Sequence, residues 1–409
     1  MTSHLLDAYV WEGLLTFRLT DKISILKTSI QVLMEHKKVK GRTLTREEKL
    51  SLYRDGYVVV KKAVSDELVD AARYRINNAE KGTYPGAHED LTNLVNASDV
   101  TPVLHEAMGY FDPPIACQVG VLRPRKPGEY FNNVGYKDKG MPYFGAESHM
   151  DGLCTIGVPQ EVVEGTPEEI YYRYISSGPK GDIGRSADVM GHNSVPLFED
   201  PAMTLGMGSF TTFAFVCLND QTREGCGQTA LLRGAHHETE KFFRWQYEVN
   251  GHIGPEGPGW PRLDYDCENH CGLVYLPQMV RDKFIDDTSD SSPDGMKWPR
   301  PTQILMEPGD ACLTLFNMPH SATRNEFGTE NRTNIIFRIR NKKRQPNHMV
   351  SGVSDHPDRG QRGEWLEYEE GNDPWLRSKF ALCNMWDEWE GMQDIVTEME
   401  GQERVPYEV

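Results

Sequence analysis

The sequence predicts a mainly β protein with helical decoration, an α+β chain built on a jelly-roll core. Runs of β-branched and apolar residues between about 114 and 340 have the composition of strands. Segments with helical periodicity bracket this β-rich centre on both sides. Strands and helices do not alternate as βαβ units, which disfavours Rossmann and TIM-barrel architectures and favours an antiparallel jelly roll.

The first part of the chain contains local signals for helices and one strand. Residues 14–36 space their apolar side chains by three and four, as an amphipathic helix does. Thr45 and Glu48 have the spacing of a capping box ahead of a second helix. The run YVVVKKAV at 57–64 is rich in β-branched residues and predicts a strand, after which Ser65 is placed to cap a third helix.

The centre and the end of the chain contain the remaining predicted elements. The turn Glu307-Pro308-Gly309-Asp310 lies between two apolar runs, 302–306 and 311–316, which are expected to pair as neighbouring strands. The final segment, about 373–400, predicts a helix. Other predicted strands cover 114–124, 204–220, 227–234 and 332–340.

These elements suggest three regions along the chain. Residues 1–56 form a helical extension, 57–345 form the jelly-roll domain, and 346–409 form a C-terminal loop and helices. The domain contains two polar, Gly/Pro-rich insertions at about 158–203 and 238–300. Long insertions on a barrel form lids or substrate walls, or inert surface, and the sequence leaves both interpretations open.

Composition limits the classes of partner. With 61 acidic against 44 basic residues, the formal charge of −17 disfavours nucleic acid and anionic membranes and favours a small-molecule substrate. No apolar run approaches the roughly 20 residues that cross a bilayer. The early acidic residues Asp7 and Glu12 disfavour a signal or transit peptide, so a cytoplasmic protein with eight free thiols is expected. Oligomeric state is not predicted.

A candidate metal site begins with the pattern H-x-D, which occurs three times. On a strand, residues i and i+2 project from one face, so an imidazole and a carboxylate can bind one metal. The copy at His356/Asp358 follows the last strand, and the copy at His88/Asp90 precedes the β-rich centre. Only His149/Asp151 lies among the predicted strands.

The expected third ligand is His320, which follows the apolar run 311–316. Two histidines and one carboxylate on one face of an octahedral metal leave three positions open, as in non-haem Fe(II) oxygenases. Asn325 and Arg332 follow His320 at +5 and +12. The histidine of an isolated H-x-D pattern is more often an ordinary core residue than a metal ligand. Together with His320, Asn325 and Arg332 in this order, the pattern at His149/Asp151 instead favours a metal site.

The set resembles the phytanoyl-CoA dioxygenase family of Fe(II)/2-oxoglutarate-dependent oxygenases. The resemblance runs from about residue 50 to about 340 and includes LYRDGYVVVKKAVSDELVDAARYRIN, FAFVCLNDQTREGCGQTALLRGAHHE and MEPGDACLTLFNMPHSATRN. It excludes both insertions and both ends of the chain. Three features depart from the family: the interval from Asp151 to His320 is longer, the arginine falls one residue later, and Phe215 stands where some members carry Trp.

This resemblance implies a double-stranded β-helix and a set of cosubstrates. His149, Asp151 and His320 would bind Fe(II), with 2-oxoglutarate and O2 as cosubstrates. The resemblance favours Arg332 as the guanidinium for the distal carboxylate of 2-oxoglutarate, because Arg338 lies six residues further along the strand, about 20 Å away. Arg338 is then a structural or substrate-side residue, and Phe215 is either a cosubstrate contact or an ordinary core residue.

The implied reaction is oxidation of an aliphatic C–H of a small metabolite, by hydroxylation, desaturation or oxidative cyclisation, as in secondary metabolism. The basic residues at 338–344 fit either a carboxylate or phosphate on the substrate or a solvated strand end, and the solvated strand end is the commoner explanation. Two alternatives stay open: a Zn-dependent or cupin-like enzyme with the same triad, and a non-catalytic binding jelly roll. His236 and His237 are expected to serve packing or a turn.

Overall fold

The computed structural model describes residues 41–80, 83, 85–126, 149–150, 154–158, 203–207, 211–249, 258–259, 274–291, 295, 297–339, 341, 366–367 and 383–401. A compact unit runs from Thr43 to Val409. Asp151, the predicted helix at 14–36 and residues 159–202 of the first predicted insertion lie outside the described residues. The predicted division into three regions stays a prediction.

The elements that begin the described chain follow their local sequence signals. Helix α2 (Arg46–Asp55) starts at a complete capping box, in which the Thr45 side chain accepts from the Glu48 N–H and the Glu48 carboxylate accepts from the Thr45 N–H. Strand β1 (Tyr57–Val60) follows, and Ser65 caps helix α3 (Asp66–Asn77). The two predicted caps are confirmed, because capping depends only on residues within one turn, whereas the strand ends at Val60 and is shorter than the predicted 57–64.

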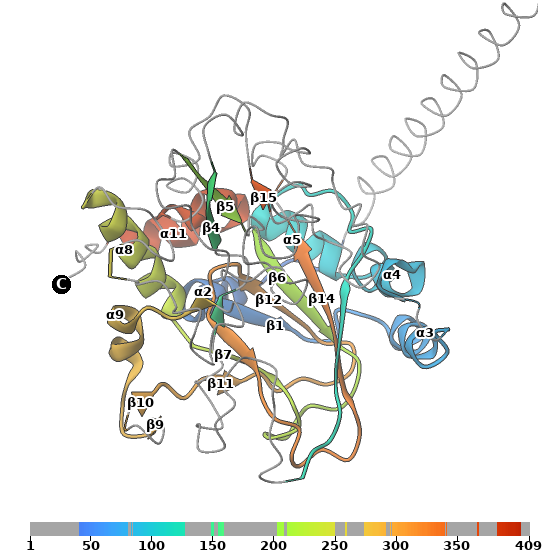
Figure 1. Ribbon diagram of the computed structural model, residues 1–409. Coiled ribbons are helices and arrows are strands. Elements are labelled where there is room, and N and C mark those ends of the chain that lie inside the picture. Colours follow the sequence, from blue (N-terminus) through green and yellow to red (C-terminus); the bar gives the residue numbers. More distant parts are fainter. Residues whose placement is uncertain are drawn as a thin grey trace, which may run out of the picture. The chain divides into compact units, whose positions relative to one another are not determined.

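The first sheet has five antiparallel strands in the order β1-β12-β6-β14-β2 (Figure 1). Its central strand β6 (Thr212–Cys217) pairs on one side with β12 (Ala311–Leu315) and on the other with β14 (Arg332–Ile339). Strand β2 (Gln118–Leu122) pairs with β14 and forms an edge. Every residue of β6 and β12 is buried, which fits their apolar, β-branched composition.

The second sheet has the order β11-β7-β13-β3-β8 and is also antiparallel. It faces the first sheet, since the Phe213 ring in β6 contacts the His320 ring in β13 at 4.8 Å between centroids. Its strands are β3 (His149–Met150), β7 (Thr229–Leu231), β8 (Val274–Tyr275), β11 (Thr302–Gln303) and β13 (His320–Ala322).

One predicted pairing and one predicted strand are corrected by the structure. The runs 302–306 and 311–316 do not pair with each other, because β11 belongs to the second sheet and β12 to the first. The turn at Glu307–Asp310, with Gly309 at φ +85°, carries the chain from one sheet to the other. The predicted strand 204–220 is also two strands, β5 (Met203–Met207) and β6, which lie in different sheets.

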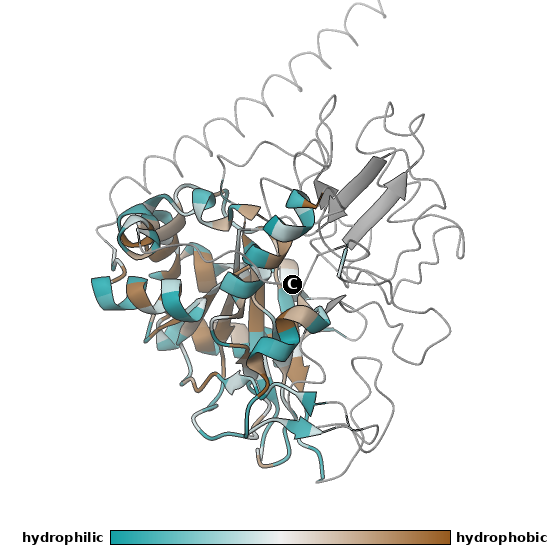
Figure 2. Cartoon of the chain, turned by 90° about the vertical axis from the view of Figure 1, so that its left-hand side faces the viewer, coloured by the Kyte–Doolittle hydropathy of each residue, from teal (hydrophilic) through white to brown (hydrophobic). Residues whose placement is uncertain are grey.

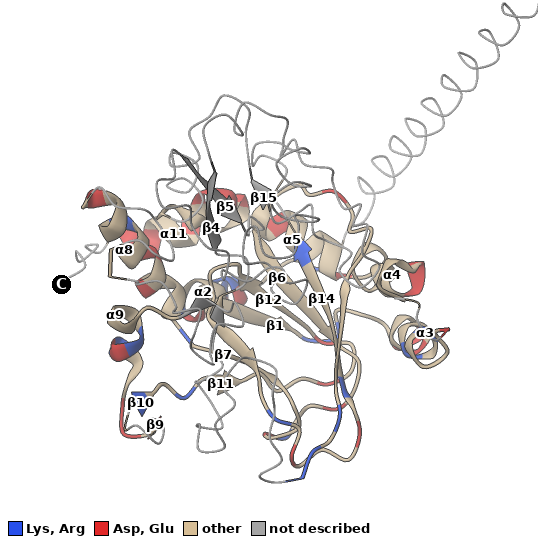
Figure 3. Cartoon of the chain, viewed as in Figure 1, with Lys and Arg blue, Asp and Glu red and all other residues tan. Residues whose placement is uncertain are grey.

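Helices cover the outside of this framework. Apolar strands lie inside and the helices turn hydrophilic residues outward (Figure 2). The charged residues gather on helices and loops, and most of the first sheet carries none (Figure 3). The remaining elements are η1 (Pro85–Ala87), α4 (Glu89–Asn96), α5 (Val100–Met108), β4 (Cys154–Val158), α8 (Ala235–Glu248), α9 (Gln278–Arg281), η4 (Asp282–Phe284), β9 (Asp290–Ser291), β10 (Lys297–Trp298) and β15 (Leu366–Glu367).

The predicted C-terminal helix is interrupted within residues 383–401. The structure has two 3-10 turns, η7 (Met385–Glu388) and η8 (Glu390–Met392), before helix α11 (Gln393–Glu400). Trp389 leaves helical geometry at φ −114°, ψ 77° and its side chain is buried against the core. A Cβ on Gly391 would overlap the Glu106 carbonyl oxygen, so close packing of this segment overrides its helical periodicity.

Five cysteines, at 117, 217, 226, 312 and 383, are free and buried. Within the described ranges, no helix combines the length and apolar character required to cross a bilayer.

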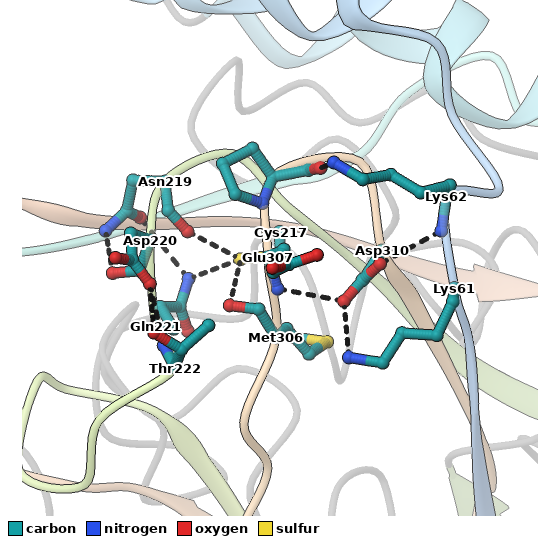
Figure 4. A network of polar contacts seen from close by, with 11 residues as sticks. Lys61, Lys62, Cys217, Asn219, Asp220, Gln221, Thr222, Met306, Glu307 and Asp310 are labelled. Atoms are coloured by element: carbon teal, nitrogen blue, oxygen red, sulfur yellow. Dashed lines mark hydrogen bonds and ion pairs between the residues drawn. The ribbon is translucent and has the colours of Figure 1, made fainter.

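Asp310 anchors the turn that carries the chain between the sheets (Figure 4). Its carboxylate is fully buried and accepts from Lys61 Nζ at 2.8 Å, from the Lys62 N–H at 2.9 Å and from the Glu307 N–H at 2.8 Å. One side chain therefore holds the start of β12 to the end of β1.

Replacing Asp310 with Ala is expected to lower the free energy of unfolding by about 3 kcal/mol, because two backbone N–H groups lose a charged, buried acceptor. Urea denaturation measures the change. Lys61→Ala is the matched control: the Lys61 side chain is more than half exposed and both backbone bonds survive, so its cost is at most about 1 kcal/mol. Equal losses for both variants would contradict this account of the turn.

Candidate functional site

The register of the second sheet brings two of the predicted ligands together. His149 in β3 lies directly opposite His320 in β13, an antiparallel pairing of segments far apart in sequence. Residues directly opposite in such a pair have neighbouring Cα atoms. The side chain of His149 and the whole of Asp151 lie outside the described residues. The triad therefore stays a prediction, and among the described side chains no group of three His, Cys, Asp or Glu could hold a metal.

The hydrogen bond of His320 selects a tautomer suited to metal binding. Its Nδ1 lies 2.9 Å from the Met318 carbonyl oxygen, and the side chain is buried. A carbonyl can only accept, so Nδ1 carries a proton, and in the neutral imidazole the lone pair is then on Nε2. That is the form in which a neutral imidazole coordinates a metal through Nε2.

Phe213 is a residue of the site that the sequence reasoning missed. Its ring packs against the His320 ring, and the guanidinium carbon of Arg338 lies 5.4 Å above the same ring. Alternation along β6 gives Phe213 and Phe215 one face of the sheet, and their rings are 5.9 Å apart. Phe215 is fully buried opposite Ile336. The alternation of residues along this strand could have shown that Phe213 and Phe215 share a face. Only the packing of the two sheets shows that Phe213 is the ring beside His320.

Arg332 places a buried cation at the start of β14. Its Nε donates to the Gly227 carbonyl at 2.5 Å and its Nη1 to the Gly120 carbonyl at 3.4 Å. Burial lowers the pKa of Arg332 to about 10, which leaves the guanidinium charged at neutral pH. No carboxylate among the described residues forms an ion pair with it. A buried charge without a counter-ion is costly, so the arrangement suits an anionic ligand.

Glycines and Asn325 make room for this arginine. A Cβ on Gly227, which has φ +82°, would approach the Arg332 Cβ to 3.1 Å, and a Cβ on Gly120 would meet Nη1 at 3.3 Å. Asn325 donates to the carbonyls of Leu122 and Glu330 and so fixes the loop that leads into β14. The residue at +5 from His320 therefore shapes the approach of Arg332.

The other H-x-D copies have other surroundings. His88 caps helix α4, and its Nδ1 accepts from the Asp90 N–H at 3.1 Å. Asp90 in turn pairs with Arg75 at 3.0 Å. His356 and Asp358 lie outside the described residues.

His236 and His237 lie at the start of α8, and both contact Tyr53 in α2. The His236 side chain is fully buried, its Nε2 lies 2.8 Å from the Tyr53 carbonyl oxygen, and its ring is 3.8 Å from that of His237. Burial lowers the pKa of both imidazoles. Both histidines pack the joint between α2 and α8.

Comparisons with known proteins give structural neighbours only. No protein-family model and no curated protein matches the sequence. A structure of HygX from Streptomyces hygroscopicus with iron bound is 13% identical, with a TM-score of 0.36 over 81% of this chain and 98% of that one. The carbocyclase SnoK of nogalamycin biosynthesis, described as non-heme and alpha-ketoglutarate dependent, is 13% identical, with a TM-score of 0.31 over 74% and 88%. GIG2 from Candida albicans is 12% identical, with a TM-score of 0.33 over 72% and 63%. Likeness at this level assigns no activity to the chain.

The buried histidines predict a loss of stability in acid. Their pKa values are lower in the folded than in the unfolded protein, so the unfolded chain binds more protons as the pH falls below about 6.5. Their stabilising contribution is therefore complete above that pH and is lost below it, by at most about 1.4 kcal/mol per pH unit for each group.

Urea denaturation of the wild type and His236→Gln between pH 7.5 and 5 measures this contribution. Glutamine keeps a donor for the Tyr53 carbonyl and does not titrate. Burial raises the pKa of nearby Glu240 to about 7, which opposes the trend, so the difference between the two proteins is the quantity to follow. A difference independent of pH would show that His236 does not titrate on unfolding.

Proposed function

We propose that the chain is an Fe(II)/2-oxoglutarate-dependent oxygenase that oxidises an aliphatic C–H of a small-molecule metabolite. The observation that carries the proposal is the pairing of His149 with His320 across β3 and β13. A distal histidine was expected to meet the H-x-D segment, and a directly opposite register puts two residues within reach of one metal ion. Localisation in the cytoplasm and the three predicted regions of the chain belong to the same proposal.

The order of the strands supports a double-stranded β-helix. Along the chain, β2, β6, β12 and β14 enter the first sheet, and β3, β7, β11 and β13 enter the second. The chain thus crosses repeatedly between two facing antiparallel sheets, as it does in a jelly roll. In this fold a ligand is held between the sheets, where His320 and Arg332 lie.

The described residues fit the proposed cofactors. His320 presents Nε2 in the ligating form, and Arg332 supplies a buried cation. His149 and Asp151 would complete the ferrous site. When bound, iron, 2-oxoglutarate and O2 supply the oxidising chemistry, with succinate and CO2 as coproducts.

The residues of this chain would divide the work of binding and positioning. Arg332 would hold the distal carboxylate of 2-oxoglutarate, while the Met318 carbonyl fixes the proton of His320 at Nδ1. The Phe213 ring packs against His320 and restrains the plane of its imidazole. Phe215, buried beside Phe213, would help to exclude water from the cosubstrate.

Anaerobic addition of Fe(II) and 2-oxoglutarate to the apo-protein tests this proposal. A metal-to-ligand charge-transfer band should appear in the visible and should be absent in His149→Ala and His320→Ala. Arg332→Gln should keep the band but raise the Kd of 2-oxoglutarate by about tenfold to a hundredfold, because hydrogen bonds to a charged group are lost. His88→Ala, in the capping copy of H-x-D, is the control and should leave the band unchanged.

Other outcomes would overturn the proposal. A normal charge-transfer band in His320→Ala would show that His320 is not the third metal ligand. Zn-supported turnover without 2-oxoglutarate or O2 would identify a metal-dependent enzyme of another kind. Unimpaired ligand binding by all triad variants would identify a non-catalytic jelly roll.

A further inference from the structure

One face of β14 presents two cations separated by an amide and an apolar side chain. Arg332, Asn334, Ile336 and Arg338 alternate along the strand, so they share one face. That face looks toward the second sheet, because Asn334 Nδ2 donates to Thr229 Oγ1 in β7 at 3.3 Å. Both arginines are buried, at 4% and 9% exposure.

The two guanidinium groups lean toward each other along the strand. Arg332 Nη1 reaches the carbonyl of Gly120, which lies opposite Asn334. Arg338 Nη1 donates at 2.8 Å to the side chain of Gln118, which lies opposite Ile336. The Arg332 side chain therefore extends along the strand to the level of Asn334, and the Arg338 side chain extends back to the level of Ile336.

This lean changes what the pair can bind. The two Cα atoms are about 20 Å apart, but residues 334 and 336, beside which the guanidinium groups lie, are separated by only about 7 Å. A five-carbon diacid spans about 5 Å between its carboxyl carbons. One such diacid, lying along the strand, can therefore meet both cations. The side chain of Ile336 would then face its methylene groups.

The arrangement also has a direction. The Phe213 ring contacts both the Arg338 guanidinium and the His320 ring, so Arg338 is at the end of the face nearest the proposed iron. Arg332 lies at the other end, against the Gly227 turn. Arg338 would therefore meet the 2-oxo acid end of a bound 2-oxoglutarate, and Arg332 would meet its distal carboxylate.

We propose that Arg338 is a second binding residue for 2-oxoglutarate, which neutralises the carboxylate at the 2-oxo end while Arg332 holds the distal one. This inference rests on the proposed function. It revises the expectation that only one of the two arginines can reach one small dianion.

Binding of two ligands separates the roles of the arginines. 2-Oxopentanoate has the carbon chain and the 2-oxo acid of 2-oxoglutarate but no distal carboxylate. The Kd of each is measured by calorimetry on the Fe(II)-loaded full chain without O2. The wild type should prefer 2-oxoglutarate. Arg332→Gln should bring the two Kd values closer together. Arg338→Gln should raise the Kd of both ligands about tenfold or more and leave the ratio of the two Kd values unchanged.

Three controls protect the result. Arg338→Lys keeps a positive charge and should recover part of the affinity. Arg73→Gln removes an arginine on α3 that donates to the Leu218 carbonyl, and should change neither Kd. Iron content and thermal unfolding of each variant exclude loss of metal or fold as the cause.

The outcomes distinguish this inference from the proposed function. If Arg338→Gln leaves both Kd values unchanged while the wild type binds 2-oxoglutarate, Arg338 has no part in binding and only the inference is overturned. If Arg338→Gln abolishes the preference between the ligands, the proposed orientation is wrong. If the wild-type protein binds neither ligand, the proposed function itself fails.

Discussion

The polar interior between the two sheets is the constraint on which the rest of this structure depends. The space between two packed sheets fills readily with apolar side chains, yet here it contains Arg332, Asn334 and Gln221, all buried. Gln221 Nε2 donates to Asn334 Oδ1 at 2.7 Å, and Asn334 Nδ2 in turn donates to Thr229 Oγ1 in the opposite sheet. The strands must keep their register for these bonds to form, because a one-residue slip would turn every polar group to the other face.

The same network ties the interior to the outer turn. Gln221 also donates to the Cys217 thiol, and the Met306–Gln221 bridge brings the chain to the turn held by Asp310. Burial raises the pKa of Cys217 to about 12, so this thiol remains neutral beside Arg332 and offers it no counter-charge. Arg332 therefore receives no counter-charge from this thiol, as the proposed binding of an anion requires.

How far the sequence predicted these features depended on the range of the interactions. The caps at Thr45 and Ser65 were predictable because the interacting atoms lie within one helical turn. The pairing of 302–306 with 311–316 was predicted wrongly, since a turn sequence does not reveal which sheet each flanking strand joins. His149 and His320 could be named as partners through the order of motifs, but the Phe213 ring that contacts both His320 and Arg338 comes from another strand, β6.

The separation of Arg332 and Arg338 shows why spacing along a strand is an insufficient guide to a binding site. Their Cα distance follows from the sequence alone and predicts two unrelated cations. The positions of the charged groups depend instead on glycine at 120, whose missing side chain admits one guanidinium, and on Gln118, which accepts from the other. Both of these neighbours belong to β2, an edge strand more than 200 residues earlier in the chain. In an acidic protein, two inward-facing cations with an apolar residue between them favour a ligand with two negative ends and an apolar middle.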